Sequence, residues 1–417
     1  MSTFTPPSPQ LEVNPGNRIQ SGALRHSTFG LKAAAAFLMI GFLAMLVLPL
    51  AVTDFRYVPT ISKTEKRMLN AFPAWSWNGE ALDQFPAKFE AAFNDHFGFR
   101  NLLVLWHSHF KLYCLGVSPV EDVVLGRKKE WLYYAKSVKA CRKIEALPKQ
   151  EVEQWVHELK TKQAWLAAHH VRYLLVVAPS KEDIYPEYLP NYVHEIRYHR
   201  FFDDILAGLG TDSGVEVLDL RETLRQGKKL GLGPVYDLTD THWSQIGAFL
   251  ATNQILLRLQ SWFPELQPTP LSNRTLSSHR GKGGDLAQMM GLQDEMLEDR
   301  IVIEKGPDSP EAALMRLQTE WPRDLLKDDP MVFETKGSDK KLTLLMTGDS
   351  FGGGIMRFLS EHFRRTVRLQ IQIPYTPWFQ ALIPKLVEAE KPDIYLDVYC
   401  TRSLKHPPAV AIGGDGK

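Results

Sequence analysis

The chain has 417 residues, of which 44% are hydrophobic, and a formal net charge of +1. This length and composition allow one large domain or two small ones. The 49 Lys and Arg residues nearly balance the 48 Asp and Glu residues, so charge gives no argument for a nucleic acid or another polyanion as partner. The three cysteines show no CxxC spacing, which argues against a zinc site, a redox dithiol or a disulfide framework; one disulfide remains open.

The N-terminal part contains one segment suited to a membrane. Residues 1–32 are rich in Pro, Ser, Gly and Asn and predict a disordered tail. Residues 33–52 carry no charge and are long enough to cross a bilayer as a helix. A cleaved signal peptide would usually have a shorter apolar stretch and a small-residue cleavage site, so we favour a retained anchor. Basic residues lie on both sides of the span, so they do not choose its orientation.

The chain then passes through a connector into alternating helix and strand patterns. Residues 53–79 form the expected connector, and phenylalanines every four residues across 80–115 predict a helix. The further expected elements are a hairpin or two short strands at 123–134, a helix at 149–170, strands at 173–178 and 215–220, a helix at 245–259, strands at 341–347 and 367–373, a helix at 378–390 and a strand at 393–399. This order predicts an α/β domain with a mostly parallel sheet.

We expect this domain to occupy residues 80–405. Within it, residues 263–340 are the least regular and are interpreted as a long insertion over one end of the sheet. Residues 406–417 are expected to be disordered.

The candidate nucleophile is Ser350. It follows the apolar run that begins at Lys341, in the sequence Gly348-Asp349-Ser350, and three glycines then lead into a helical pattern. A serine at such a strand-to-helix turn projects at the C-terminal edge of a sheet, where N–H groups after Ser350 could hold an oxyanion. The alternative interpretation is a helix cap by Asp349 or Ser350.

The candidate general base is His242, with Asp240 two residues before it. In an extended loop both side chains point the same way, so the carboxylate can hold the imidazole while the other ring nitrogen faces Ser350. Trp243 could wall this site or stack on a sugar. The alternative is Asp240 as a helix N-cap. No histidine lies in an HExxH or similar pattern, and we expect neither a metal nor a cofactor.

Short blocks in fixed order resemble the SGNH-hydrolase-like domain of the AlgJ/AlgX-type alginate O-acetyltransferase family. The blocks are Asp240-Thr-His-Trp243, Gly348-Asp-Ser-Phe351, Asn94-Asp-His-Phe-Gly-Phe-Arg100, Val124-Leu-Gly126 with Trp131-Leu-Tyr133, Pro179-Ser-Lys181 with Tyr185-Pro186, and Gly284-Asp-Leu286. They run from about residue 65 to residue 405, and the anchor makes the chain more similar to the membrane-tethered AlgJ type.

The resemblance implies a three-layer α/β/α domain outside the inner membrane that attaches acetyl groups to an exopolysaccharide. It also implies a membrane-bound O-acyltransferase as partner and acetyl supplier. We name Lys181, Tyr375, Trp378 and Arg402 with Trp243 as candidate substrate contacts. Relatives often carry a Glu-Arg pair near the C-terminus, where this chain has Thr401-Arg402.

Three functions fit these observations. The first is a single-pass, inner-membrane O-acetyltransferase with its catalytic domain in the periplasm, which passes acetyl from Ser350 to a polysaccharide hydroxyl. The second is a carbohydrate esterase, in which water is the acceptor. The third is a non-catalytic scaffold of a polysaccharide export complex, which would not need to retain Asp240, His242 and Ser350 together.

Overall fold

The computed structural model describes residues 28–53, 55, 60–61, 68–75, 77–128, 130–142, 146–193, 200–211, 213–306, 312–315, 331–335, 340–370 and 377–405. The chain forms two compact units, an N-terminal one (residues 1–62 with 67–101) and a C-terminal one (residues 63–66 with 102–417). Residues 1–27 of the expected tail and all of 406–417 lie outside the described residues. The expected domain start at residue 80 stays a prediction, and the structure groups residues 80–101 with the N-terminal unit.

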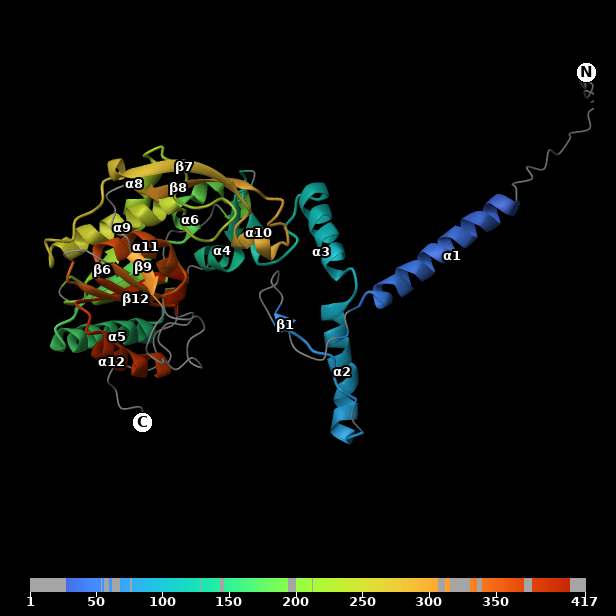
Figure 1. The fold of residues 1–417 in the computed structure, drawn as a ribbon, viewed down its shortest axis with the longest axis horizontal. Coiled ribbons are helices and arrows are strands. Elements are labelled where there is room, and N and C mark those ends of the chain that lie inside the picture. The colour runs from blue at the N-terminus through green and yellow to red at the C-terminus, as the bar shows by residue number, and fades with distance from the viewer. Residues whose placement is uncertain are drawn as a thin grey trace, which may run out of the picture. The chain divides into compact units, whose positions relative to one another are not determined.

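The first helix of the N-terminal unit is α1 (Thr28–Ala51), which begins five residues before the expected span (Figure 1). Its stretch Lys32–Ala51 has a mean hydropathy of 2.5 and is 6% buried within the protein. By length and composition, this helix can cross a membrane. The predicted single apolar helix at the N-terminus is therefore present.

The second helix, α2 (Gly79–His96), carries the phenylalanine repeat on one side. Ring centroids of Phe85 and Phe89 lie 5.9 Å apart, and those of Phe89 and Phe93 6.1 Å apart, as expected for residues one helical turn apart. The side chain of Asn78 caps the helix by accepting a hydrogen bond from the Glu80 N–H. The unit also contains a short strand pair, β1 (Thr60–Ile61) and β2 (Met68–Leu69).

The C-terminal unit is built on a seven-stranded sheet in the order β6-β5-β13-β11-β12-β10-β9. The strands, in that order, are Val217–Asp219, Arg172–Ala178, Ile394–Cys400, Thr343–Gly348, Arg365–Gln370, Met331–Thr335 and Ala312–Met315. The first five are parallel, and β10 and β9 are antiparallel to their neighbours. The prediction of a mostly parallel sheet is confirmed.

Helices cover both faces of this sheet and make the domain a three-layer α/β/α fold. One face carries α5 (Lys149–Ala168), α7 (Phe201–Leu209) and α12 (Pro377–Glu390), and the other α8 (Arg221–Lys228), α9 (Gln245–Gln260) and α11 (Phe351–Leu359) (Figure 1). All of β11 is buried: Leu344 and Met346 pack into one core and Leu345 into the other. This explains its unbroken apolar run.

The segment 263–340 is more regular than expected. Strands β7 (Arg274–Gly281) and β8 (Glu298–Lys305) form a long antiparallel hairpin, in which Ile301 and Ile303 pack on the α9 side of the domain. β9 and β10 extend the main sheet itself. The interpretation of this segment as irregular was wrong for these strands. Polar side chains occupy most positions of β7 and β8, and many of these positions are exposed, so the two strands show no clear hydrophobic pattern.

The described residues also contain several shorter elements. The α-helices and strands among them are α3 (Arg100–His109), β3 (Val123–Leu125), β4 (Leu132–Tyr134), α4 (Ala135–Arg142), α6 (Lys181–Ile184) and α10 (Asp285–Met289). Single turns are η1 (Phe110–Cys114), η2 (Pro186–Tyr188), η3 (Asn191–Val193), η4 (Leu271–Asn273), η5 (Ser360–His362) and η6 (Thr401–Leu404). Cys114 and Cys400 are free thiols, so no disulfide joins this pair.

Candidate active site

The loop before α9 carries Asp240 and His242. Tyr236 and Trp243 pair across its base as an antiparallel bridge, so the residues between them form a closed loop. The N-cap of α9 is Ser244, whose hydroxyl accepts a hydrogen bond from the Gly247 N–H. Asp240 is therefore not the cap of this helix, and its carboxylate is available to the histidine.

The turn between β11 and α11 presents Ser350. At Gly348, a Cβ atom would lie 2.0 Å from the Val398 carbonyl oxygen, so only glycine fits beside β13. The Asp349 carboxylate accepts hydrogen bonds from the N–H groups of Phe351 (3.0 Å) and Cys400 (2.7 Å). Ser350 stands at the N-cap position without a side-chain cap bond. Its hydroxyl is thus free of the structural role that the cap interpretation assigned to it.

The three predicted residues form one hydrogen-bonded chain. The Asp240 Oδ1 to His242 Nδ1 distance is 2.7 Å, and the His242 Nε2 to Ser350 Oγ distance is also 2.7 Å. The Asp240 carboxylate also accepts a hydrogen bond from the His242 backbone N–H at 2.9 Å. Asp240 and Ser350 therefore each lie within hydrogen-bond reach of His242, although Ser350 comes 108 residues after His242. This is the arrangement that a nucleophile, a base and an orienting carboxylate require.

A second carboxylate, Asp285, lies beside the same imidazole. Its Oδ2 is 3.5 Å from His242 Nδ1, and it accepts hydrogen bonds from the Thr241 N–H (2.8 Å) and the Thr241 hydroxyl (2.5 Å). The Asp285 N–H in turn donates to Asp240 Oδ2 at 3.0 Å. Gly284 permits this approach, because a Cβ there would lie 2.4 Å from the Asp240 Cβ. Sequence reasoning found Gly284-Asp-Leu286 as a block and missed its position beside the histidine.

The two carboxylates set the charge of the site. Burial alone would lower the pKa of His242, but the Asp240 hydrogen bond and the charges of Asp240 and Asp285 outweigh it and raise this pKa above 6.5. Burial alone would raise the pKa of Asp240, yet the bonds and charge of His242 hold it well below its usual value. Burial, followed by the charge of Asp240, raises the pKa of Asp285. Of the two carboxylates, Asp240 is the one whose ionised form His242 stabilises most directly.

Lys181 binds the Asp240 loop through backbone carbonyl oxygens. Its ammonium group donates to the carbonyl oxygens of Leu132 (2.9 Å), Asp237 (2.7 Å), Leu238 (2.6 Å) and Asp240 (3.2 Å). The residue is 3% exposed, and burial, offset in part by the charge of Asp240, lowers its pKa to about 7. The expectation that Lys181 contacts substrate was wrong, because its charge is fully used on backbone carbonyls of the loop.

Glu298 of β8 binds the same loop through its hydrogen-bond donors. Its carboxylate accepts hydrogen bonds from the Leu238 N–H and the Thr239 hydroxyl, each at 2.7 Å. The residue is 4% exposed. The hairpin that the sequence did not reveal therefore contributes directly to the position of the Asp240 loop.

Trp243 is part of the core and not a sugar-stacking surface. The side chain is 4% exposed and meets the ring of Phe351 edge-on, with centroids 5.1 Å apart. Gly354 makes room for it, since a Cβ there would lie 2.5 Å from Trp243 Nε1. Trp243 packs against Phe351, and the ring centroid of Phe351 lies 5.0 Å from that of His242. Trp243 therefore borders the site only indirectly, through Phe351.

Of the other candidate substrate contacts, the structure describes the side chain of Arg402 but not those of Tyr375 and Trp378. Arg402 lies in η6 directly after β13, with its guanidinium carbon 5.3 Å from the ring centroid of Phe351 and 5.7 Å from that of Tyr134. This places its positive charge beside the triad. Tyr375 lies outside the described residues, as does the side chain of Trp378, which belongs to α12.

The N–H groups that follow Ser350 are already occupied. The N–H of Phe351 donates to the Asp349 carboxylate, that of Gly352 to the Asp349 carbonyl (3.3 Å) and that of Gly353 to the Ser350 carbonyl (3.0 Å). The expectation that these groups form the oxyanion site was wrong in this arrangement. Among the described residues, the Ser350 N–H has no backbone or side-chain acceptor, so it is the donor closest in sequence that remains available.

The His242 cluster also has the composition of a metal site. One ligand atom each of Asp240, His242 and Asp285 lies within 4.8 Å of the others. The hydrogen bonds of Asp240 to His242 and of Thr241 to Asp285 account for the same closeness. The expectation of no metal stays a prediction.

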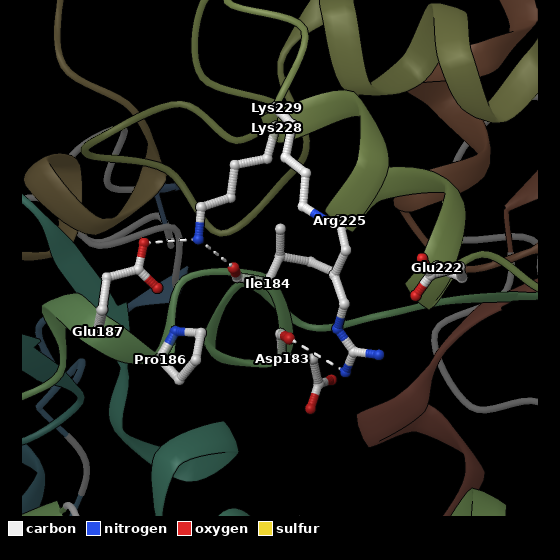
Figure 2. Close-up of a pocket in the computed structure, with 8 residues that line it drawn as sticks. All are labelled: Asp183, Ile184, Pro186, Glu187, Glu222, Arg225, Lys228 and Lys229. Atoms are coloured by element: carbon white, nitrogen blue, oxygen red, sulfur yellow. Dashed lines mark hydrogen bonds and ion pairs between the residues drawn. The ribbon is translucent and has the colours of Figure 1, made fainter.

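A separate pocket opens between α6 and α8, with a volume of about 420 Å³. Its lining contains none of the triad residues. As Figure 2 shows, Lys228 reaches both Glu187 (2.6 Å) and the Ile184 carbonyl (3.0 Å), and Arg225 points to the Asp183 carbonyl (3.5 Å). Lys228 and Arg225 are thus bound to other residues of the pocket lining. The triad is therefore the stronger candidate for the reaction site.

The family model "SGNH hydrolase-like domain, acetyltransferase AlgX" matches residues 123–370 of the chain. The chain belongs to this family. The matched residues include Asp240, His242, Asp285 and Ser350, whereas Arg402 lies beyond them. Membership confirms the predicted SGNH-hydrolase-like fold.

Two relatives are probable alginate O-acetylases named AlgJ. The protein of Pseudomonas aeruginosa is 28% identical over 180 residues, which are 42% of this chain and 43% of the relative. That of Azotobacter vinelandii is 28% identical over 221 residues, or 49% and 52%. The chain thus matches about half the length of these relatives.

Two solved structures are similar to part of this chain. The O-acetyltransferase domain of Pseudomonas putida AlgJ is 17% identical with a TM-score of 0.44, over 69% of this chain and 94% of that one. Bacillus cereus PatB1 is 17% identical with a TM-score of 0.48, over 68% and 97%.

Proposed function

We propose that the chain is a membrane-anchored O-acetyltransferase that acts on an exopolysaccharide of the alginate type. The observation that carries this proposal is the chain of 2.7 Å hydrogen bonds from Asp240 through His242 to Ser350. It is supported by membership in an acetyltransferase family and by similarity to probable alginate O-acetylases. The apolar helix α1 supports anchoring, and the periplasm is the proposed location of the C-terminal unit.

In the first half-reaction, Ser350 Oγ attacks the carbonyl carbon of an acetyl donor while His242 Nε2 takes the hydroxyl proton. Asp240 holds the ring and stabilises the imidazolium. The tetrahedral oxyanion is held by the Ser350 N–H and by the positive charge of Arg402. Collapse breaks the bond to the leaving group, which receives the proton from His242, and leaves acetyl-Ser350.

In the second half-reaction, a sugar hydroxyl replaces the donor. His242 takes its proton, the sugar oxygen attacks acetyl-Ser350, and the bond to Ser350 Oγ breaks as that oxygen regains the proton. The product is an acetylated sugar and free enzyme. A membrane-bound O-acyltransferase is the proposed supplier of acetyl groups, and no cofactor is needed for these steps.

Esterase activity is the second candidate, because the His242 side chain keeps 30% of its surface exposed and water can reach it. Transfer and hydrolysis differ only in the acceptor. The test gives the purified full chain an acetyl ester, with and without an oligouronate acceptor. Acetylated oligosaccharide supports the transferase, whereas the same yield of free acetate with and without acceptor would contradict it in favour of the esterase.

A matched variant keeps this test specific to the triad. Ser350→Ala is expected to abolish both products, because no other group takes the place of the nucleophile. A scaffold would show neither product in the wild type. If Ser350→Ala equals the wild type in both assays, the proposed mechanism is wrong.

A further inference from the structure

The helical segment that begins the C-terminal unit leaves a strip of apolar side chains uncovered. The strip consists of residues on α3 and η1 that are each 47–66% exposed: Leu102, Leu103, Trp106, Phe110 and Tyr113. Three of them recur every fourth residue, so they lie along one side of the helix. A contiguous exposed patch with three aromatic rings is unusual for a surface that meets only water.

The opposite side of the same segment is fixed to the domain. Leu105 and Leu112 pack against the small core around α10, and Ser108 is buried. His109 forms a 2.6 Å contact with Glu295. The exposed strip therefore belongs to a docked helix with a defined orientation, and the side that carries Trp106 and Phe110 faces outward.

The charges of this segment have one sign. No Asp or Glu occurs from His96 to Val120, whereas Arg100 and Lys111 are basic. With 3.6 residues per turn, Arg100, His107 and Lys111 share a third side of the helix, next to the apolar strip. Aromatic and leucine side chains on one side and basic ones beside them are typical of a helix that lies in the interface of an anionic bilayer.

We propose that the strip of Leu102, Leu103, Trp106, Phe110 and Tyr113 docks on the surface of an anionic phospholipid bilayer. Two observations favour lipid over a protein partner. The same chain carries a helix that is apolar enough to cross a membrane, so an anchored chain would keep this strip close to a bilayer. A second copy of the chain would bring two segments of the same charge together. The docking is a second membrane contact, in addition to the anchor.

The test uses the full chain in lipid nanodiscs, so that the anchor is present in every sample. In a Cys114→Ser and Cys141→Ser background, which keeps the buried Cys400, single cysteines replace Leu103, Phe110, His107 or Leu230. Each carries a fluorophore that nitroxide-labelled lipids quench. Leu230 is the matched control, because it is an exposed leucine (58%) on another part of the same unit.

Several-fold stronger quenching at positions 103 and 110 than at 230 is expected in phosphatidylglycerol discs, with an intermediate value at 107. Lys111→Glu is expected to reduce quenching at 110, and discs of phosphatidylcholine alone to give less quenching than anionic ones. Equal quenching at all four positions would overturn the proposal. A blue-shifted label without lipid quenching at 103 and 110 would also overturn it, since the strip would then be covered by protein. None of these readings depends on acetyl transfer, so the outcome is independent of the proposed enzyme activity.

Discussion

The imidazole of His242 lies between the Ser350 hydroxyl and two carboxylates, Asp240 and Asp285. The shorter contact and the two hydrogen bonds from His242 make Asp240, and not Asp285, the proposed orienting residue. Asp285 acts through position and charge: it fixes Thr241 and adds negative potential to the ring. We therefore expect the two acids to respond differently to substitution.

Asp240→Asn should lower kcat by roughly 10⁴-fold, since an amide no longer selects the productive imidazole tautomer. Asp285→Asn retains an acceptor for Thr241 and should cost much less. It should also move the acid limb of the kcat/KM profile to lower pH, because the negative charge that helps to raise the pKa of His242 is gone and the base must be neutral to act.

The measurement is a pH–rate profile of acetyl ester turnover for the wild type and both variants. An acid limb of Asp285→Asn at or above that of the wild type would show that Asp285 does not act on His242 through charge. Asp285→Glu is the control, because it keeps the charge.

Lys181→Met should lower the free energy of unfolding by roughly 2–4 kcal/mol, because four backbone carbonyl oxygens lose their bond to the buried ammonium group. Lys149→Met is the control, since that side chain is 92% exposed. Thermal unfolding of both variants checks the difference. Equal midpoints would mean that water replaces the ammonium group.

At the scale of elements, glycines set how closely α10 and α11 approach the Asp240 loop. Gly284→Ala should destabilise the fold by about 1–3 kcal/mol and displace Asp240, since the new methyl group would lie 2.4 Å from its Cβ. Gly79→Ala has no atom within 4 Å of the added group and should leave both stability and activity unchanged. Denaturant unfolding together with ester turnover separates the two cases, and an active, stable Gly284→Ala variant would contradict the packing argument.

Elements with a clear hydrophobic period were predictable from the sequence. β5, β11 and β13 are buried on both faces, and α2, α5 and α9 show helical spacing, so their apolar patterns stand out. The hairpin β7–β8 was not predictable, because polar side chains occupy most of its positions and its partner strand comes after α10. Sheet pairing of this kind depends on contacts that local pattern does not carry.

The candidate site follows the same division. Asp240, His242 and Ser350 were predictable because each belongs to a short block with a local reason for its residue types. The roles of Asp285 and Lys181 were not, since they depend on contacts 44 and 59 residues away along the chain. Trp243 was assigned to substrate because an aromatic residue looks the same in sequence whether its ring faces sugar or core.

For the whole molecule, the anchor has a direct test. The N-terminal sequence of the protein isolated from membranes should include α1, because residues 32–51 are long enough to remain in the bilayer. Extraction should require detergent and not high salt. A mature N-terminus that begins after Val52 would refute the retained span.

The central claim is that Ser350 carries the acetyl group, and mass spectrometry of the acid-quenched full chain tests it most directly. After incubation with an acetyl ester, the peptide that contains Ser350 should gain the mass of one acetyl group. His242→Ala should slow its appearance by roughly 10³-fold or more, and Ser350→Ala should eliminate it. An acetyl group on another residue in place of Ser350, or a Ser350→Ala variant that still turns over the ester, would contradict the account.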